Sequence, residues 1–251
     1  MFLTVTILIA VTVAIAGLVL VPRLMPGRIV FDASPDRPHP FGYKMSWLAI
    51  RTTDTQAVVN ALEMESPELA NWRSGIGTIY CDDFAETHIF VAPPVEGWTF
   101  VIGLPLPHPL GRNFVDKSTE LLLGLGAHFD EVQYFFTYPL IDFFAWARIV
   151  DGKLARAFAM GDEGTLWNKG RTSREEMSLG LKLFELRGVR GRRGEAGTEI
   201  LLHPTEEHVL LLASKWSLDP TRIDQRRADP GLGYIGRAPS SWRPERLRKA
   251  A

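Results

Sequence analysis

The hydrophobic pattern of the chain begins with an unbroken apolar run over residues 2–21, FLTVTILIAVTVAIAGLVLV, which contains no charged residue. A helix of that length spans roughly 30 Å, the thickness of a bilayer core. Lipid offers backbone groups no hydrogen bonds, so a membrane favours a helix there despite the many β-branched residues. We therefore predict an N-terminal transmembrane helix, residues 1–21.

The residues flanking this run predict its orientation. A cleaved signal peptide usually has Lys or Arg before its apolar run, and none precedes this one. The first positive charges are Arg23 and Arg28 on its C-terminal side. Positively charged flanks tend to remain in the cytoplasm. We expect an uncleaved single-pass helix with the following domain in the cytoplasm. The alternative is the opposite orientation, with the domain outside.

Residues 22–40 are rich in Pro, Gly, Asp and Arg and end in SPDRPHP. Repeated prolines remove backbone donors and favour extended conformations, so we predict a short, stiff linker.

A single domain is expected over residues 41–251. Its first elements are a strand at 43–51, then a helix beginning near Asp54, then a meander of short strands at 78–81, 87–92 and 97–103.

The second half of the domain carries stronger local signals. The run AWARIVDGKLARAFAM predicts a hairpin, because Asp151 and Gly152 suit the left-handed positions of a type I′ turn. Another strand or two, broken near Pro139, precede it. Helices are expected at 116–128 and, with Thr205 as N-cap, at 205–216. Residues 181–186 suggest a further strand, and from Asp219 the chain is expected to be an irregular tail.

These elements together predict an α+β fold, an antiparallel sheet with hairpins and a few packed helices, preceded by the transmembrane helix. The composition, 46% hydrophobic and 23% charged, suits a globular domain with a membrane segment. With 28 Lys and Arg against 29 Asp and Glu, the net charge of -1 gives no general attraction to nucleic acid. Cys81 is the single cysteine, which excludes an intramolecular disulfide.

Familiar catalytic motifs are missing from the sequence. It contains no phosphate-binding glycine loop of standard spacing, no HExxH and no GxSxG. The segment DDFAETH could bring Asp82, Asp83, Glu86 and His88 together, although such a run is more often a polar turn. We predict no catalytic residue, no metal site and no cofactor. The alternative is an enzyme whose site is assembled from distant residues such as Asp82, His88 and Glu163.

Two polar segments are candidates for binding. In GDEGTLWNKG, the acidic pair Asp162 and Glu163 precedes Trp167, a composition suited to gripping a partner protein; the alternative is that Trp167 is buried in the core. In RGVRGRRG, four arginines could contact anionic lipid, or the segment could be a solvated loop between two strands. These four candidate membrane-surface residues are Arg187, Arg190, Arg192 and Arg193.

Several stretches of the domain together resemble uncharacterised bacterial proteins, some of which are similar to immunity proteins of toxin systems. They are WLAIRTTD, VAPPVEGWTFVIG, YPLIDFFAWARIVDGKLARAF and WSLDPT. The resemblance implies a bacterial protein whose partner is another protein, such as a toxin. The membrane helix lies outside the resemblance, and it is the apolar run that leads us to expect a location in the inner membrane. We therefore predict a membrane-tethered, non-catalytic protein-binding module, an immunity or regulatory protein. The alternatives are the enzyme described above and an envelope assembly component.

Overall fold

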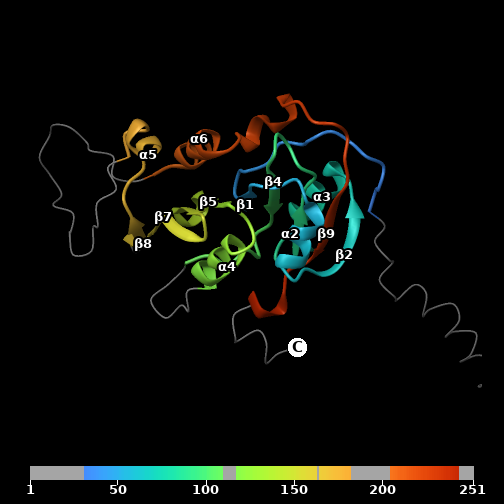
Figure 1. Ribbon diagram of the computed structural model, residues 1–251, viewed down its shortest axis with the longest axis horizontal. Helices are drawn as coiled ribbons and strands as arrows, with labels where there is room; N and C mark the ends of the chain where they lie inside the picture. The colour runs from blue at the N-terminus through green and yellow to red at the C-terminus, as the bar shows by residue number, and fades with distance from the viewer. Residues whose placement is uncertain (1–30, 110–116, 163, 182–203, 243–251) are drawn as a thin grey trace, which may run out of the picture. The chain divides into compact units, whose positions relative to one another are not determined.

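The computed structural model describes residues 31–109, 117–162, 164–181 and 204–242 (Figure 1). Among these residues, no helix has both the length and the apolar character needed to cross a bilayer. The predicted transmembrane helix at 1–21 lies outside the described residues, as does the predicted strand at 181–186 beyond Leu181.

A nine-stranded sheet runs through the described part of the chain, and every pair of neighbouring strands is antiparallel. The predicted α+β class is confirmed. The strand order is β2-β9-β3-β4-β1-β5-β6-β7-β8. The strands are β1 (Ser46–Ile50), β2 (Glu65–Ala70), β3 (His88–Val91), β4 (Thr99–Ile102), β5 (Glu131–Tyr138), β6 (Phe143–Val150), β7 (Lys153–Gly161), β8 (Gly164–Gly170) and β9 (Gly233–Arg237).

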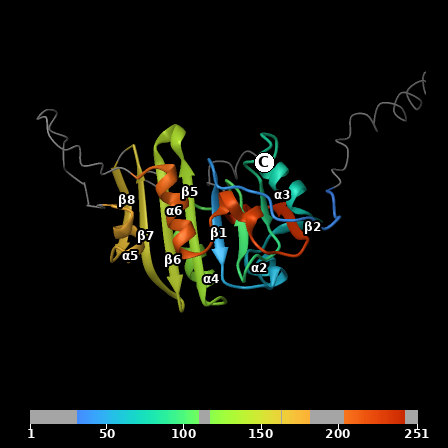
Figure 2. The ribbon, with the colours of Figure 1, turned by 90° about the horizontal axis from the view of Figure 1, so that it is seen from above.

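Helices cover both faces of this sheet. One face packs against α2 (Thr55–Ala61) and α4 (Lys117–Gly126), and the other packs against α3 (Trp72–Ile79), α5 (Arg174–Ser178) and α6 (Glu206–Trp216). Figure 2 shows α6 lying along β5 and β6, which it contacts. Short 3-10 turns complete the elements: η1 (Pro139–Ile141), η2 (Pro220–Gln225) and η3 (Ser240–Trp242).

Burial on both faces explains why the central strands are almost continuously apolar. Every residue of β1 and β4 is buried. On the α6 side the core is aromatic, and Trp47 stacks on Phe135 with ring centroids 5.2 Å apart. On the α4 side the core is largely aliphatic and includes Leu48 and Val132. A strand covered on both sides loses the alternation of polar and apolar residues that marks a half-exposed strand.

The structure agrees with the predictions of a turn and of helix starts, which depend on only a few neighbouring residues. Val150 pairs with Lys153, and the two residues between them, Asp151 and Gly152, have φ of +49° and +70°, which confirms the predicted hairpin turn. Asp54 caps α2 by accepting from the Ala57 amide. Thr205 caps α6 as predicted.

Among the helices and strands, β2, α3, β8 and β9 were not predicted. β8 lies within GDEGTLWNKG, which we had interpreted as a polar binding segment. Residues 65–77, for which we had predicted no strand or helix, form β2 and most of α3, and α3 also takes up Thr78 and Ile79, which we had assigned to a strand. The tail expected to be irregular contains β9, which lies between β2 and β3. Gly233 and Gly236 permit this position because a Cβ at either would collide with the neighbouring strand or with Met64.

Residues 31–40, within the predicted linker, contact the domain along α3. The Asp36 carboxylate accepts hydrogen bonds from the amides of Trp72 (2.7 Å) and Arg73 (3.0 Å), which have no partner within the helix. The Asn71 amide donates to the Asp32 carbonyl at 2.8 Å. The carboxylate of Asp36 also complements the positive end of the helix dipole. This part of the linker region is therefore attached to the domain.

The two glycines of α3 provide a matched test of how closely this helix packs on the sheet. A Cβ at Gly75 would overlap the Phe90 ring, whereas a Cβ at Gly77 meets nothing within 4 Å. We expect Gly75→Ala to lower the free energy of unfolding by about 1–3 kcal/mol through overpacking. Gly77→Ala should raise it by about 0.5–1 kcal/mol, because alanine is the better helix former. Urea unfolding of both variants measures this, and equal effects would contradict the close packing of α3.

Candidate protein-binding site

Several turns and loops meet at one end of the sheet, which we call the η1 end and define as residues 43–44, 103–109, 139–142 and 161–162. The backbone brings them together: the Thr137 amide donates to the Met45 carbonyl (3.1 Å), and the Gly103 amide donates to the Ser46 carbonyl (3.0 Å). Phe144, near the start of β6, pairs with Met160 near the end of β7. The turns after β5 and β7 therefore lie at the same end.

The turn between β5 and β6 presents two aliphatic side chains to solvent. Pairing of the two strands continues to Tyr138 and Phe143, so the turn consists only of PLID. Proline fixes the first φ of η1, and Asp142 closes the turn with φ +48° and an amide that donates to the Pro139 carbonyl at 3.2 Å. Leu140 is 72% exposed and Ile141 is 49% exposed. Large aliphatic side chains are thus held outward on a short, closed turn.

An aromatic cluster supports the base of this turn on the α4 side. Phe136 and Phe143 pack edge to face with centroids 5.0 Å apart, and the His108 ring packs edge to face on Phe136 at 5.1 Å. Nδ1 of His108 lies 3.1 Å from the Leu106 carbonyl, which can only accept, so Nδ1 carries the proton in this contact. Burial lowers the pKa of His108, which favours the neutral ring. The loop after β4 is thereby locked against the turn.

A second set of contacts supports the η1 end on the α6 side. Glu206, in the first turn of α6, accepts from the Lys44 amide (2.9 Å) and from the Thr137 hydroxyl (2.8 Å). The Tyr80 hydroxyl accepts from the Gly42 amide and donates to the Tyr43 carbonyl at 3.0 Å. Burial of that hydroxyl raises the pKa of Tyr80 to about 12. The loop that carries Tyr43, itself 55% exposed, is held at both ends.

Acidic side chains lie next to the apolar tip. Asp142 and Asp162 are both exposed. The backbone of the turn after β7 approaches the base of η1, since a Cβ at Gly161 would stand 3.5 Å from the Phe143 ring. The η1 end therefore combines apolar anchors with a partly acidic rim, in which Lys44 is the exposed cation.

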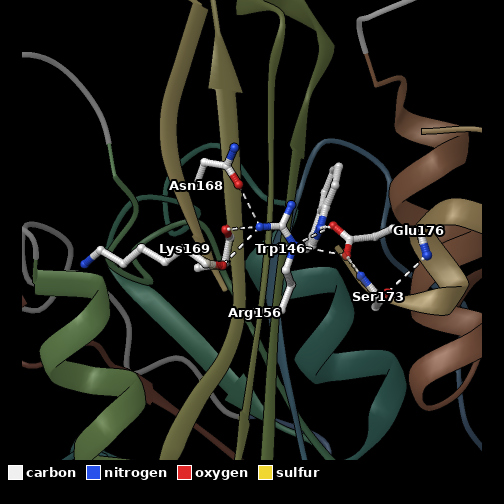
Figure 3. A network of polar contacts seen from close by, with 7 residues as sticks. Trp146, Arg156, Asn168, Lys169, Ser173 and Glu176 are labelled. Carbon is white, nitrogen blue, oxygen red and sulfur yellow. Dashed lines mark hydrogen bonds and ion pairs between the residues drawn. The ribbon is translucent and has the colours of Figure 1, made fainter. Parts of the chain in front are cut away.

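A buried ion pair fixes the neighbouring edge of the sheet (Figure 3). Nε of Arg156, on β7, donates to both carboxylate oxygens of Glu176 on α5, at 2.8 and 3.0 Å. Glu176 also accepts from the Trp146 indole at 2.8 Å. The two charged side chains are 3% and 0% exposed. Such a pair adds little net stability because of its desolvation cost, but it fixes geometry.

The same network reaches β8 and the loop after it. Nη1 of Arg156 donates to the Asn168 side chain (2.8 Å) and to the Lys169 carbonyl (3.0 Å). Ser173 and Glu176 form a reciprocal capping box at the start of α5. The Arg156 guanidinium therefore links β7 to β8 and α5. The Glu176 carboxylate, which also accepts from Trp146, links β6 to the same network. Neither Arg156 nor Glu176 was singled out by sequence analysis, because their partners lie up to 30 residues away.

The predicted partner-binding residues are separated by the structure. Asp162 is exposed in the turn after β7, and Glu163 lies outside the described residues. Trp167 is only 4% exposed and packs in the core on the α4 side, so its side chain does not reach the surface. Arg187, Arg190, Arg192 and Arg193 also lie outside the described residues. Sequence analysis did not identify Leu140 and Ile141 as candidate binding residues. They follow Pro139, which separates two apolar strands.

The acidic segment after α3 forms a polar turn. Asp82, Asp83 and Glu86 are exposed. His88 contacts the Thr87 hydroxyl at 2.9 Å and the Phe84 ring, and burial together with Arg237 lowers its pKa. Within the described ranges, no group of three or more His, Cys, Asp or Glu side chains is placed to hold a metal ion.

Comparisons of the chain with protein-family models, with curated proteins and with solved structures found no match.

Removing the buried carboxylate tests whether Arg156 depends on it. We expect Glu176→Gln to lower the free energy of unfolding by about 3–5 kcal/mol, because it leaves the guanidinium buried without a counter-charge. Glu175→Gln, one position earlier and partly exposed, is the matched control and should cost less than about 1 kcal/mol. Denaturant unfolding measures both. Similar losses for the two variants would show that Glu176 does not carry the network.

The buried histidine makes stability depend on pH. Unfolded chains protonate histidine near the ordinary pKa of 6.5, whereas folding holds His108 neutral to a lower pH. The contribution of neutral His108 to the free energy of unfolding is therefore complete above pH 6.5. It is lost as the pH falls from 6.5 toward the lowered pKa of His108. We expect His108→Phe to reduce the loss of stability between pH 7.5 and 5.5, with His88 accounting for part of the remainder. An unchanged pH profile in urea unfolding would contradict this role of His108.

Proposed function

We propose that this protein is a membrane-tethered, non-catalytic binding module that captures another protein through the η1 end. The observation that carries the proposal is the exposure of Leu140 and Ile141, 72% and 49%, on a turn closed by Pro139 and Asp142. Each of these aliphatic side chains contributes about 1.5–3 kcal/mol when a partner buries it.

The rigidity of the η1 end supports a binding role. The His108 cluster holds the turn from one side, and the Glu206 and Tyr80 contacts hold the loop of Tyr43 from the other. Because the tip is already ordered, binding loses little conformational entropy there. Apolar anchors on a fixed scaffold are typical of the few residues that carry most of the energy of a protein interface.

The chemistry of the tip indicates the kind of partner. Leu140 and Ile141 require an apolar pocket, and the neighbouring Asp142 and Asp162 favour basic residues around it. A toxin or a regulated protein with such a surface fits the proposal, in keeping with the resemblance to immunity proteins. In this proposal the N-terminal helix holds the domain at the cytoplasmic face of the bacterial inner membrane, where tethering raises the effective concentration for a membrane-associated partner.

Site-specific photocrosslinking in cells tests the location of the site. A photoreactive amino acid at position 140 should yield a discrete adduct with one protein, which mass spectrometry identifies. The matched control is position 123: Leu123 is also an exposed leucine, 39% exposed, but lies on α4 away from the turn. Adducts formed equally at both positions, or at neither, would count against the η1 end as the site.

Affinity measurements with the protein identified in this way test the energetic role of the tip. Leu140→Asp should weaken binding at least about tenfold, because it places a charge in the apolar contact. Its melting temperature should stay close to that of the unsubstituted protein, since the side chain is largely exposed. Leu123→Asp should leave affinity unchanged. Equal affinities for the Leu140 and Leu123 variants would contradict the proposed function.

A further inference from the structure

A hollow lies between the outer face of α6 and the η2 turn that follows this helix. Its volume is about 540 Å³, which is within the range of small-molecule sites. The side chains that line it are Leu211, Ser214, Asp219, Arg222, Gln225 and Arg226. None of these residues belongs to the η1 end, so the hollow is separate from the proposed protein-binding site.

The start of η2 is fixed by a local cap. One carboxylate oxygen of Asp219 accepts from the amide of Thr221 at 2.9 Å and from its hydroxyl at 2.7 Å. η2 then bends at Arg222, where φ is -126° and ψ is 23°, and side chains from both sides of this bend line the hollow. The cap and the bend thereby turn one side of η2 toward α6.

The two arginines of the hollow keep donors available for a ligand. Nε of Arg222 lies 4.0 Å from Asp219, and Nη1 of Arg226 lies 3.8 Å from Glu96. Both distances are longer than a hydrogen bond, so these carboxylates attract the guanidinium groups without occupying their N–H donors. The exposed side-chain amide of Gln225 adds a further donor between the two arginines.

The α6 side of the hollow is less polar. Leu211 is 40% exposed there, although its neighbours Leu210 and Leu212 are buried. The Ser214 hydroxyl donates to the Leu211 carbonyl at 2.7 Å, so its oxygen is left as an acceptor. The hollow therefore offers cationic donors on one wall and an apolar contact with a hydroxyl acceptor on the other.

This combination favours a phosphate group over a carboxylate. A phosphate monoester carries a charge of about -1.5 to -2 at pH 7 and three strong acceptor oxygens, enough for two guanidinium groups and one amide. It also carries more charge than Asp219 or Glu96, so it competes well with each of them for an arginine. A carboxylate ligand has two oxygens and no such advantage.

We infer that the hollow between α6 and η2 binds a phosphate monoester through Arg222, Gln225 and Arg226, with Leu211 contacting the rest of the ligand. The phosphate can belong to a soluble compound or to a lipid headgroup, since both present the same chemistry to the arginines.

Calorimetric titration of the full chain with glycerol 3-phosphate tests this inference. The protein is held in phosphatidylcholine nanodiscs, in enough salt to screen general attraction between charges. We expect saturable binding with a Kd of about 1 mM or below. Arg222→Gln and Arg226→Gln should each raise the Kd at least about tenfold, because each removes charge-assisted hydrogen bonds.

Arg227→Gln is the matched control, because Arg227 is the exposed neighbour of Arg226 but does not line the hollow. It should leave the Kd unchanged, and melting temperatures of the three variants should stay close to that of the unsubstituted protein. The inference is overturned if glycerol 3-phosphate shows no saturable binding, or if Arg227→Gln weakens binding as much as Arg226→Gln.

A second titration, in nanodiscs that contain phosphatidic acid, distinguishes the two sources of phosphate. If lipid headgroups enter the hollow, the apparent affinity for glycerol 3-phosphate should fall, and Arg226→Gln should abolish this competition. An unchanged affinity would assign the hollow to a soluble phosphate compound. Both results support phosphate binding and differ only in where the phosphate comes from.

Discussion

Both faces of the sheet are covered by helices, and this double burial determines which residues the strands can contain. The central strands contain little besides apolar and aromatic residues, since a polar side chain there must find its partner inside. Gln133 follows this rule in part: it is fully buried and its Nε2 donates to Glu131 and to the Trp216 carbonyl, whereas its Oε1 has no partner among the described residues. The sheet itself is therefore accessible only at its ends and edges within the described part of the chain.

The η1 end and the β8 edge both depend on interior contacts for their shape. Leu140 and Ile141 point outward because the strands they connect remain paired up to Tyr138 and Phe143, with His108 packed behind them. β8 remains aligned because Arg156 reaches it from β7 and is itself held by Glu176. In both places a buried cluster fixes the position of exposed residues.

The candidate site shows how far composition alone can lead. The residues of GDEGTLWNKG were interpreted as a polar segment suited to binding, with burial of Trp167 as the alternative. The structure confirms the alternative for Trp167 and leaves Asp162 exposed at the turn. In PLID, by contrast, Leu140 and Ile141 lie between two apolar strands, so the sequence pattern alone suggests that they are buried. Their exposure follows from the short turn, in which Asp142 adopts a left-handed conformation.

The sequence by itself determined those features whose cause lies within a few residues: the Asp151–Gly152 turn, the Thr205 cap, the start of α2 near Asp54, and the α+β class with its antiparallel hairpins. Only the tertiary structure decided that the short segment Gly233–Arg237 completes the sheet between β2 and β3, and that Arg156 meets Glu176. Local signals arise from backbone geometry and neighbouring hydrogen bonds, which one stretch of chain contains in full. The others depend on surfaces supplied by distant segments, and no short window of sequence contains both sides of such a contact.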